Sequence, residues 1–150
     1  AEEGCALFIA LDCGTTQHAR AAQARALLLD LIIADHHQPE EQLPDALAVL
    51  NPHRPDCPYP CKHLTGCGVG FKLAQATAEL LNLDWDWASV ADLLALSAAC
   101  DIVPLLGENR TLVAVGLQRL RTAPAPGLRA LMDQNTQPRS WVVSDLVFFL

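Results

Sequence analysis

Two apolar segments near the N-terminus are separated by about one helix length of chain, and this spacing restricts the possible folds. ALFIALDCG (6–14) and LIIA (31–34) have the uninterrupted apolar character of strands buried on both faces. The residues between them are rich in alanine and arginine and predict a helix, with Thr15 or Thr16 as its N-cap. A strand, a helix and a strand in this order predict a βαβ unit with parallel strands.

The rest of the chain extends this pattern and then changes it. ALAVLNP (46–52) predicts a third strand that Pro52 ends, and a proline-rich loop follows. The later segments predict helices from a glycine-rich turn to about Leu83, from about residue 86 to near Asp101, over 107–122, and a short one over 127–135. The predicted class is α/β, with a parallel sheet covered by helices on both faces and a helical second half.

Charged side chains stand where the first two strands end. Asp12 follows the first, and Asp35, His36 and His37 follow the second. Because the carboxyl ends of parallel strands meet at one edge, about 4.8 Å apart, Asp12 and His36 can reach one ion there. Carboxylate and imidazole ligands suit Mn²⁺, and less exclusively Mg²⁺ or Fe²⁺. Asp101 follows a predicted helix C-terminus, where the helix dipole disfavours a carboxylate unless a cation compensates it.

Each of these residues also has an ordinary structural interpretation. Asp12 alone is typical of a turn or a helix cap, the two histidines alone of an exposed loop, and Asp101 alone of a cap for the following turn. The agreement of three separate segments on one sheet edge favours a metal site.

Composition restricts the partners and the location. The net charge of −7 argues against binding of nucleic acid by general electrostatics, which requires Lys and Arg. With 51% apolar residues, the most apolar stretch, 87–106, is still interrupted by Asp92 and Asp101 and does not predict a membrane span. The first residues, AEEG, lack the layout of a signal peptide, so we expect a cytoplasmic protein with no membrane association.

Six cysteines raise the question of a zinc site. Cys57, Cys61, His63 and Cys67 lie close in sequence, but their gaps are irregular and no C-x-x-C pair occurs. Buried or incidental reduced thiols are therefore the preferred interpretation.

Longer stretches of the sequence resemble a known family. DHH after a strand is the signature of the DHH phosphoesterases. Together, ADHHQPEEQLPDALAVLNPHRPDCPYPCKHLTGCGVGFKLAQA, AACDIVPLLGENRTLVAVGLQRL and PGLRAL are similar to its RecJ-type branch, the 5′→3′ exonucleases specific for single-stranded DNA. The likeness runs from about residue 6 to the C-terminus. It implies hydrolysis of phosphodiester bonds by a two-metal mechanism with Mn²⁺ or Mg²⁺.

The resemblance also implies a role for each site residue. Asp12 matches an aspartate that bridges two ions, while His36 and Asp101 match further metal ligands. His37 matches a histidine that touches the scissile phosphate, and Asp35 is expected to hold the cluster in place from behind.

Two features of the family have no counterpart in these residues. Its upstream strand ending in aspartates is not matched, because Glu2 and Glu3 precede the first strand. A DHHA1 substrate-binding domain follows in the family. We therefore expect residues 1–150 to be a partial DHH domain, with a βαβ-type metal-binding part (1–52), a mainly helical part (53–139) and the start of a connection to DHHA1 (140–150).

This partial character sets expectations for the chain by itself. We expect weak metal binding, little or no hydrolysis, and self-association through the apolar sheet edge where the upstream strand would pair.

A glycine-rich segment and a helix start supply two more candidates. GCGVGFK (66–72) lacks the spacing of a phosphate-binding loop, but Lys72 is a candidate phosphate contact. Arg110, in GENR, is a candidate for substrate binding, although an ion pair with a nearby carboxylate is the more ordinary role.

Two other functional classes stay open from the sequence. One is another DHH phosphoesterase, such as an oligonucleotide or cyclic-dinucleotide hydrolase or a pyrophosphatase. The other is a non-catalytic binding module with the DHH fold.

Overall fold

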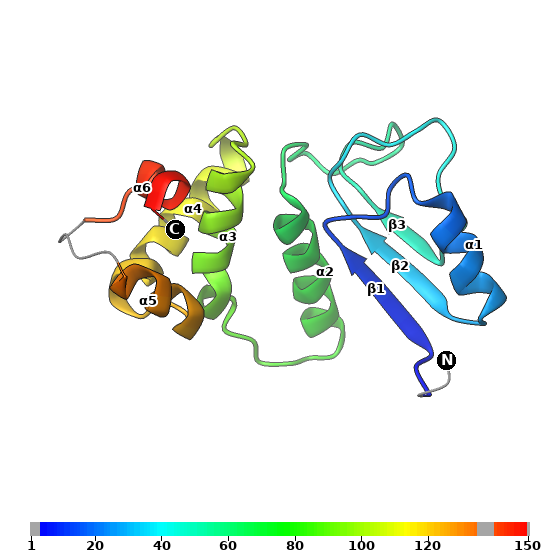
Figure 1. The fold of residues 1–150 in the computed structure, drawn as a ribbon, viewed down its shortest axis with the longest axis horizontal. Helices are drawn as coiled ribbons and strands as arrows, with labels where there is room; N and C mark the ends of the chain where they lie inside the picture. Colours follow the sequence, from blue (N-terminus) through cyan, green and yellow to red (C-terminus); the bar gives the residue numbers. More distant parts are fainter. Residues whose placement is uncertain (1–3, 135–139, 150) are drawn as a thin grey trace. The chain divides into compact units, whose positions relative to one another are not determined.

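The computed structural model describes residues 4–134 and 140–149 (Figure 1). Glu2 and Glu3, and the ends of the predicted short helix (127–135) and of the predicted final segment (140–150), lie outside the described residues. The chain forms two compact units, residues 1–76 and 77–150. The predicted division between residues 52 and 53 separates strands from helices and does not coincide with the boundary between the two compact units. The predicted parts of the domain stay a prediction.

The first unit contains a three-stranded parallel sheet in the order β1 (Leu7–Leu11), β2 (Asp30–Ala34), β3 (Ala48–Leu50). Ala34 pairs with Leu11 on one side and Leu50 on the other, so the three strands end at the same level. The predicted βαβ unit with parallel strands is therefore confirmed. The first and third strands are shorter than the apolar runs that predicted them.

Helix α1 (His18–Ala26) packs on one face of this sheet. Its Ala21 joins Leu31 and Ile33 of β2 and Val49 of β3 in a buried cluster. The N-cap residue is Gln17, without a side-chain cap hydrogen bond, so the prediction that Thr15 or Thr16 caps this helix is wrong. Thr15 is instead buried and bonded to the ends of the neighbouring strands, as described below.

Helix α2 (Gly66–Leu80) begins at a side-chain cap. The Thr65 hydroxyl accepts a hydrogen bond from the Gly68 N–H at 3.0 Å, which satisfies one of the N–H groups that a helix start leaves unpaired. The helix ends at Leu80 rather than near Leu83. Asn82 adopts a left-handed conformation (φ 52°), and the Leu83 N–H bonds to the Ala78 carbonyl, which is a standard helix termination.

The second unit is helical and has its own core. A 3₁₀ turn (Trp87–Val90) leads into α3 (Ala91–Cys100). The helices that follow are α4 (Gly107–Thr122), α5 (Pro126–Asp133) and α6 (Val143–Phe149). The range of α4 and the end of the preceding helix near Asp101 agree with the sequence. The core of this unit is built from Ala95, Ala98, Ala99, Val113, Leu120, Leu128, Met132, Trp141 and Leu146.

A fully buried carboxylate joins two parts of this helical unit. Asp92, in the first turn of α3, accepts hydrogen bonds from the N–H groups of Leu93 at 3.0 Å and Ala125 at 2.6 Å. Its position near a helix N-terminus also suits a negative charge. Asp92 thereby fixes the turn between α4 and α5 to the start of α3.

Strand β1 leaves apolar side chains uncovered. Leu7, Phe8, Ile9 and Leu11 are 43–57% exposed, although they belong to a strand whose composition is that of a buried one. In the described part of the chain, no helix combines the length and the apolar character that crossing a membrane requires.

We predict that Gly116→Ala destabilises the chain by about 1–3 kcal/mol, because α3 and α4 pack without space for a side chain there. A Cβ atom at Gly116 would overlap the Ala91 carbonyl oxygen and lie 2.5 Å from the Ala95 Cβ. Chemical denaturation measures the change. The control is Gly127→Ala in α5, where no atom lies within 4 Å of the added Cβ; it should leave stability unchanged or raise it by up to about 1 kcal/mol. Equal effects of the two substitutions would contradict the prediction.

Candidate metal centre

Asp12 lies immediately after β1 in an unusual backbone conformation. Its φ is 62°, a left-handed value that aspartate tolerates better than most residues. Its N–H donates to the Ala34 carbonyl at 2.9 Å, which continues the pairing of β1 with β2 by one residue. The turn therefore begins at Asp12, and the carboxylate stays at the sheet edge.

The start of α2 lies directly against this aspartate. A Cβ atom at Gly66 would overlap the Asp12 Oδ1 and lie 2.6 Å from the Asp12 Cα, so only glycine fits. Four residues along the helix, Gly70 lies beside Leu11 of β1. The glycines of GCGVGFK thus allow a helix to approach a strand end.

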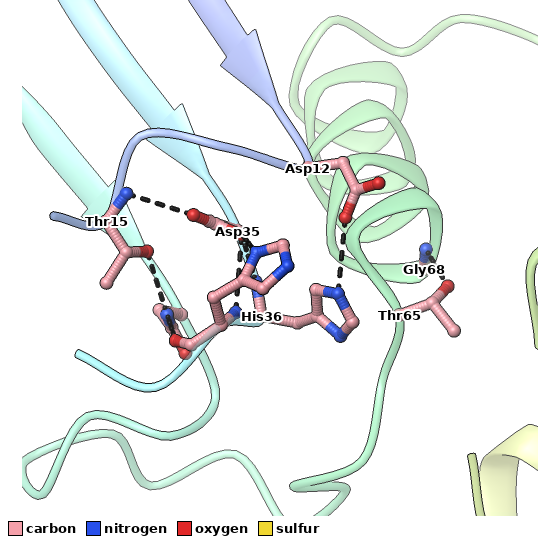
Figure 2. A network of polar contacts seen from close by, with 8 residues as sticks. Asp12, Thr15, Asp35, His36, Thr65 and Gly68 are labelled. Atoms are coloured by element: carbon pink, nitrogen blue, oxygen red, sulfur yellow. Dashed lines mark hydrogen bonds and ion pairs between the residues drawn. The ribbon is translucent and has the colours of Figure 1, made fainter. Parts of the chain in front are cut away.

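Asp12 and His36 point toward each other across the ends of β1 and β2 (Figure 2). The His36 Nε2 lies 3.2 Å from the Asp12 Oδ1; the His36 side chain is 16% exposed and that of Asp12 is 57% exposed. With His37, they form a cluster whose possible ligand atoms lie within 4.8 Å of one another. It is the one group of this kind among residues 4–134 and 140–149.

Asp35 lies behind this cluster and is 1% exposed. Its Oδ2 accepts the Thr15 N–H at 2.9 Å, and its Oδ1 accepts the N–H groups of His36 at 2.8 Å and His37 at 3.3 Å. Burial raises the pKa of Asp35, but these hydrogen bonds, with those from the side chains of His37 and Thr15, outweigh it and hold the pKa far below its usual range. Asp35 is therefore ionised and accepts hydrogen bonds only.

The carboxylate of Asp35 also fixes the His37 ring. The His37 Nδ1 lies 2.7 Å from the Asp35 Oδ1. Because an ionised carboxylate has no proton to give, Nδ1 must carry the hydrogen of this bond. The Nε2 atom of His37 is then the ring atom that can act on a metal ion or a substrate, and the side chain is 62% exposed.

Two further polar residues at this edge, Asn51 and His53, were not identified from the sequence. Asn51 follows β3 and is 3% exposed, and its Nδ2 donates to the Thr15 Oγ1 at 3.0 Å and to the His37 carbonyl at 2.8 Å. Its Oδ1 accepts the His53 N–H at 2.8 Å. A usable signal was present: Asn51 follows the third strand just as Asp35 follows the second.

His53, in the loop after β3, brings a further imidazole close to the site. Burial lowers the pKa of His53, and electrostatic repulsion from the neighbouring His63, His36 and Lys62 lowers it further. The rings of His53 and His63 are 6.3 Å apart. The sequence indicated only that His53 belongs to a proline-rich loop and predicted no role for it.

Three further predicted site residues stand on helices or at a helix end. Lys72, on α2, donates to the Gln75 Oε1 at 2.9 Å and lies over the Phe71 ring. Asp101 is the exposed C-cap residue of α3, and Arg110 is exposed in the first turn of α4; both belong to the second unit. Convergence of Asp101 with Asp12 and His36 stays a prediction.

The cysteines form neither disulfides nor a metal cluster. All six lie in the described ranges and are free thiols that are exposed or half-buried, so of the two alternatives, buried or incidental reduced thiols, they fit the second. Among the described residues, Cys57, Cys61, His63 and Cys67 do not form a group whose ligand atoms could hold one metal ion.

The fold is of the α/β class, with a parallel sheet, and carboxylate and imidazole side chains meet at the carboxyl edge of that sheet in a candidate metal site. The family model described as "DHH family, N-terminal domain" matches residues 4–98. The chain therefore belongs to the DHH family.

Comparison with individual proteins gives a more specific similarity than the family model does. The single-stranded-DNA-specific exonuclease RecJ of Salmonella typhimurium is 39% identical over 98% of this chain, which spans 28% of that relative's length. A solved structure of an exonuclease RecJ bound to manganese matches 98% of the chain with a TM-score of 0.84 and 33% identity, and the match covers 37% of that structure. RecJ from Thermus thermophilus in complex with Mg²⁺ matches 96% of the chain with a TM-score of 0.66 and 30% identity, over 19% of its own length.

We predict that Asp35→Asn destabilises the metal-free chain by about 2–3 kcal/mol, because an amide cannot accept all of the hydrogen bonds that the ionised carboxylate accepts. Thermal or chemical unfolding measures the loss. Asp30→Asn is the control, since Asp30 is exposed at the opposite end of the same strand and should change stability by less than about 0.5 kcal/mol. A neutral Asp35→Asn substitution would refute the view that this carboxylate organises the strand ends.

Proposed function

We propose that this chain is the metal-binding part of a longer exonuclease that hydrolyses single-stranded DNA with the help of Mn²⁺ or Mg²⁺. The observation that carries the proposal is the convergence of Asp12, His36 and His37 at the carboxyl edge of the sheet. The membership of the DHH family and the names of the RecJ relatives supply the reaction class. The proposed place of action is the cytoplasm, in DNA repair and recombination.

The residues present fit such an ion. Carboxylate and imidazole ligands match the preferences of Mn²⁺. Two possible ligand atoms, the Asp12 Oδ1 and the His36 Nε2, already lie 3.2 Å apart. Asp101 is the proposed further ligand from the second unit. Ions of this kind take about six ligands each, so Asp12 and His36, even together with Asp101, supply only part of one coordination shell. Residues of the longer protein are the proposed source of the rest.

The chemistry divides between the ions and the side chains. Bound divalent ions lower the pKa of a water molecule and neutralise the charge that develops on the phosphate. His37 is proposed to contact the scissile phosphate: with a proton on both ring nitrogens it donates from Nε2 to a phosphate oxygen, while Asp35 holds Nδ1 and compensates the positive charge. Asp35 acts through His37 and does not touch the substrate.

Binding of an acidic substrate by an acidic chain needs a local source of positive charge. With a net charge of −7, the chain as a whole repels DNA. The ions supply positive charge at the site, and Lys72 and Arg110 are proposed additional contacts to the DNA backbone. A DHHA1-type domain in the longer protein is the proposed surface for the rest of the strand.

We predict that the 150-residue chain binds Mn²⁺ measurably by calorimetry, and that Asp12→Asn and His36→Ala each weaken the affinity at least about tenfold. Asp30→Asn, at the opposite end of β2, is the control and should bind like the wild type. On 5′-labelled single-stranded DNA with Mn²⁺, the chain alone should give little or no product, because its coordination shells are incomplete. Unchanged affinity in both ligand variants would refute the proposed site, and turnover at the rate of a complete exonuclease would refute the incompleteness.

We predict that the chain self-associates through the uncovered β1 edge, because an apolar edge strand pairs readily with another chain. Sedimentation velocity should show a mass that rises with concentration. Phe8→Lys, on β1, should restore a monomer, whereas Leu28→Lys, which replaces an even more exposed leucine outside the strand, should not. A compact monomeric wild type at all concentrations would contradict this prediction.

A further inference from the structure

Each of the three strands is followed by a buried polar residue, and the three residues are connected to one another. Thr15, Asp35 and Asn51 are 1%, 1% and 3% exposed, and they come after β1, β2 and β3 respectively. The Thr15 N–H donates to Asp35, and the Asn51 side chain donates to the Thr15 hydroxyl. Part of this connection is visible in Figure 2. We call this set the strand-end triad.

The Asn51 amide uses both of its N–H groups and its carbonyl oxygen in hydrogen bonds. Its Nδ2 bonds to two different loops, through the Thr15 Oγ1 and the His37 carbonyl, and its Oδ1 bonds to the backbone of a third, at His53. One side chain thus joins the segments that leave all three strands. None of these contacts involves the candidate metal ligands Asp12 and His36.

The triad holds His37 from two sides. The Asn51 Nδ2 donates a hydrogen bond to the main-chain carbonyl oxygen of His37, at 2.8 Å. The Asp35 carboxylate accepts the hydrogen of the ring Nδ1. It also accepts the Thr15 N–H, and the Thr15 hydroxyl in turn accepts a hydrogen bond from Asn51. The Asn51 amide therefore holds the backbone of His37 directly and reaches its ring through Thr15 and Asp35.

We propose that Asn51 is a positioning residue, which through the strand-end triad sets the orientation of the His37 ring and directs its Nε2 toward the substrate phosphate. The consequence for catalysis rests on the proposed function. The orientation of the ring is a property of this chain alone. Asn51 itself touches neither metal nor substrate in this assignment.

A specific substitution separates positioning from simple stabilisation. Asn51→Asp has the same shape and keeps the acceptor for the His53 N–H, but it places a carboxylate oxygen against the His37 carbonyl, where a donor is required. Asn51→Ala removes the bonds without adding a charge and serves if the aspartate variant does not fold. The control is Asn109→Asp in α4: Asn109 is also 3% exposed and donates to a backbone carbonyl, that of Pro104, in the other unit.

Imidazole ¹⁵N spectra of the metal-free 150-residue chain give the deciding measurement, with His37 assigned by comparison with His37→Ala. The wild type and Asn109→Asp should show His37 with a hydrogen on Nδ1. Asn51→Asp and Asn51→Ala should lose the hydrogen-bonded Nδ1–H signal and shift toward the Nε2–H form. Calorimetry should give a Mn²⁺ affinity in the Asn51 variants close to that of the wild type, because Asn51 contacts neither Asp12 nor His36.

Retention of the Nδ1–H signal by folded Asn51 variants, with stability lowered as in Asn109→Asp, would overturn the proposal and leave Asn51 a structural residue. If the wild type does not bind Mn²⁺, the proposed function fails, and the Nδ1–H signal by itself decides the role of Asn51.

Discussion

The ionised, buried carboxylate of Asp35 is the group on which the organisation of the sheet edge depends. Removing a carboxylate from water is costly, and it is tolerated only where hydrogen-bond donors replace the lost hydration. Here the donors come from the loop after β1 and from the two histidines after β2. The requirement to satisfy one charge therefore brings together loops that are distant in sequence, and the histidines that provide donors are held in place as a result.

The pairing of Asp12 with His36 was predictable from the sequence because it follows from sheet geometry. Parallel strands of known polarity put their carboxyl ends together, whatever side chains follow. The same geometry places Asn51 at this edge after β3, but it does not predict the hydrogen bonds of Thr15 and Asn51, because threonine and asparagine are equally common in caps and turns. Thr15 was interpreted as a helix cap for that reason, and only the tertiary hydrogen bonds distinguish the two roles. Convergence of Asp101 with the cluster depends on the arrangement of two separate units, which strand geometry does not determine.

Backbone constraints and side-chain chemistry are combined at Asp12. A left-handed residue at a strand end turns the chain sharply, and the helix that begins at Gly66 occupies the space beside it. The carboxylate is consequently confined by main-chain atoms on one side and by the His36 ring on the other. Such confinement limits the reorganisation that ion binding requires, which is the usual advantage of a preformed site.

The shortness of β3 has a consequence for when the edge is ordered. This strand has three residues, and Asn51 follows its last one. Short strands fray more easily than the rest of a sheet. Each transient detachment of β3 from β2 carries the Asn51 amide away and releases the loop that contains His37. With the role proposed for Asn51, the alignment of the imidazole therefore depends on the pairing of the shortest strand of the sheet with β2.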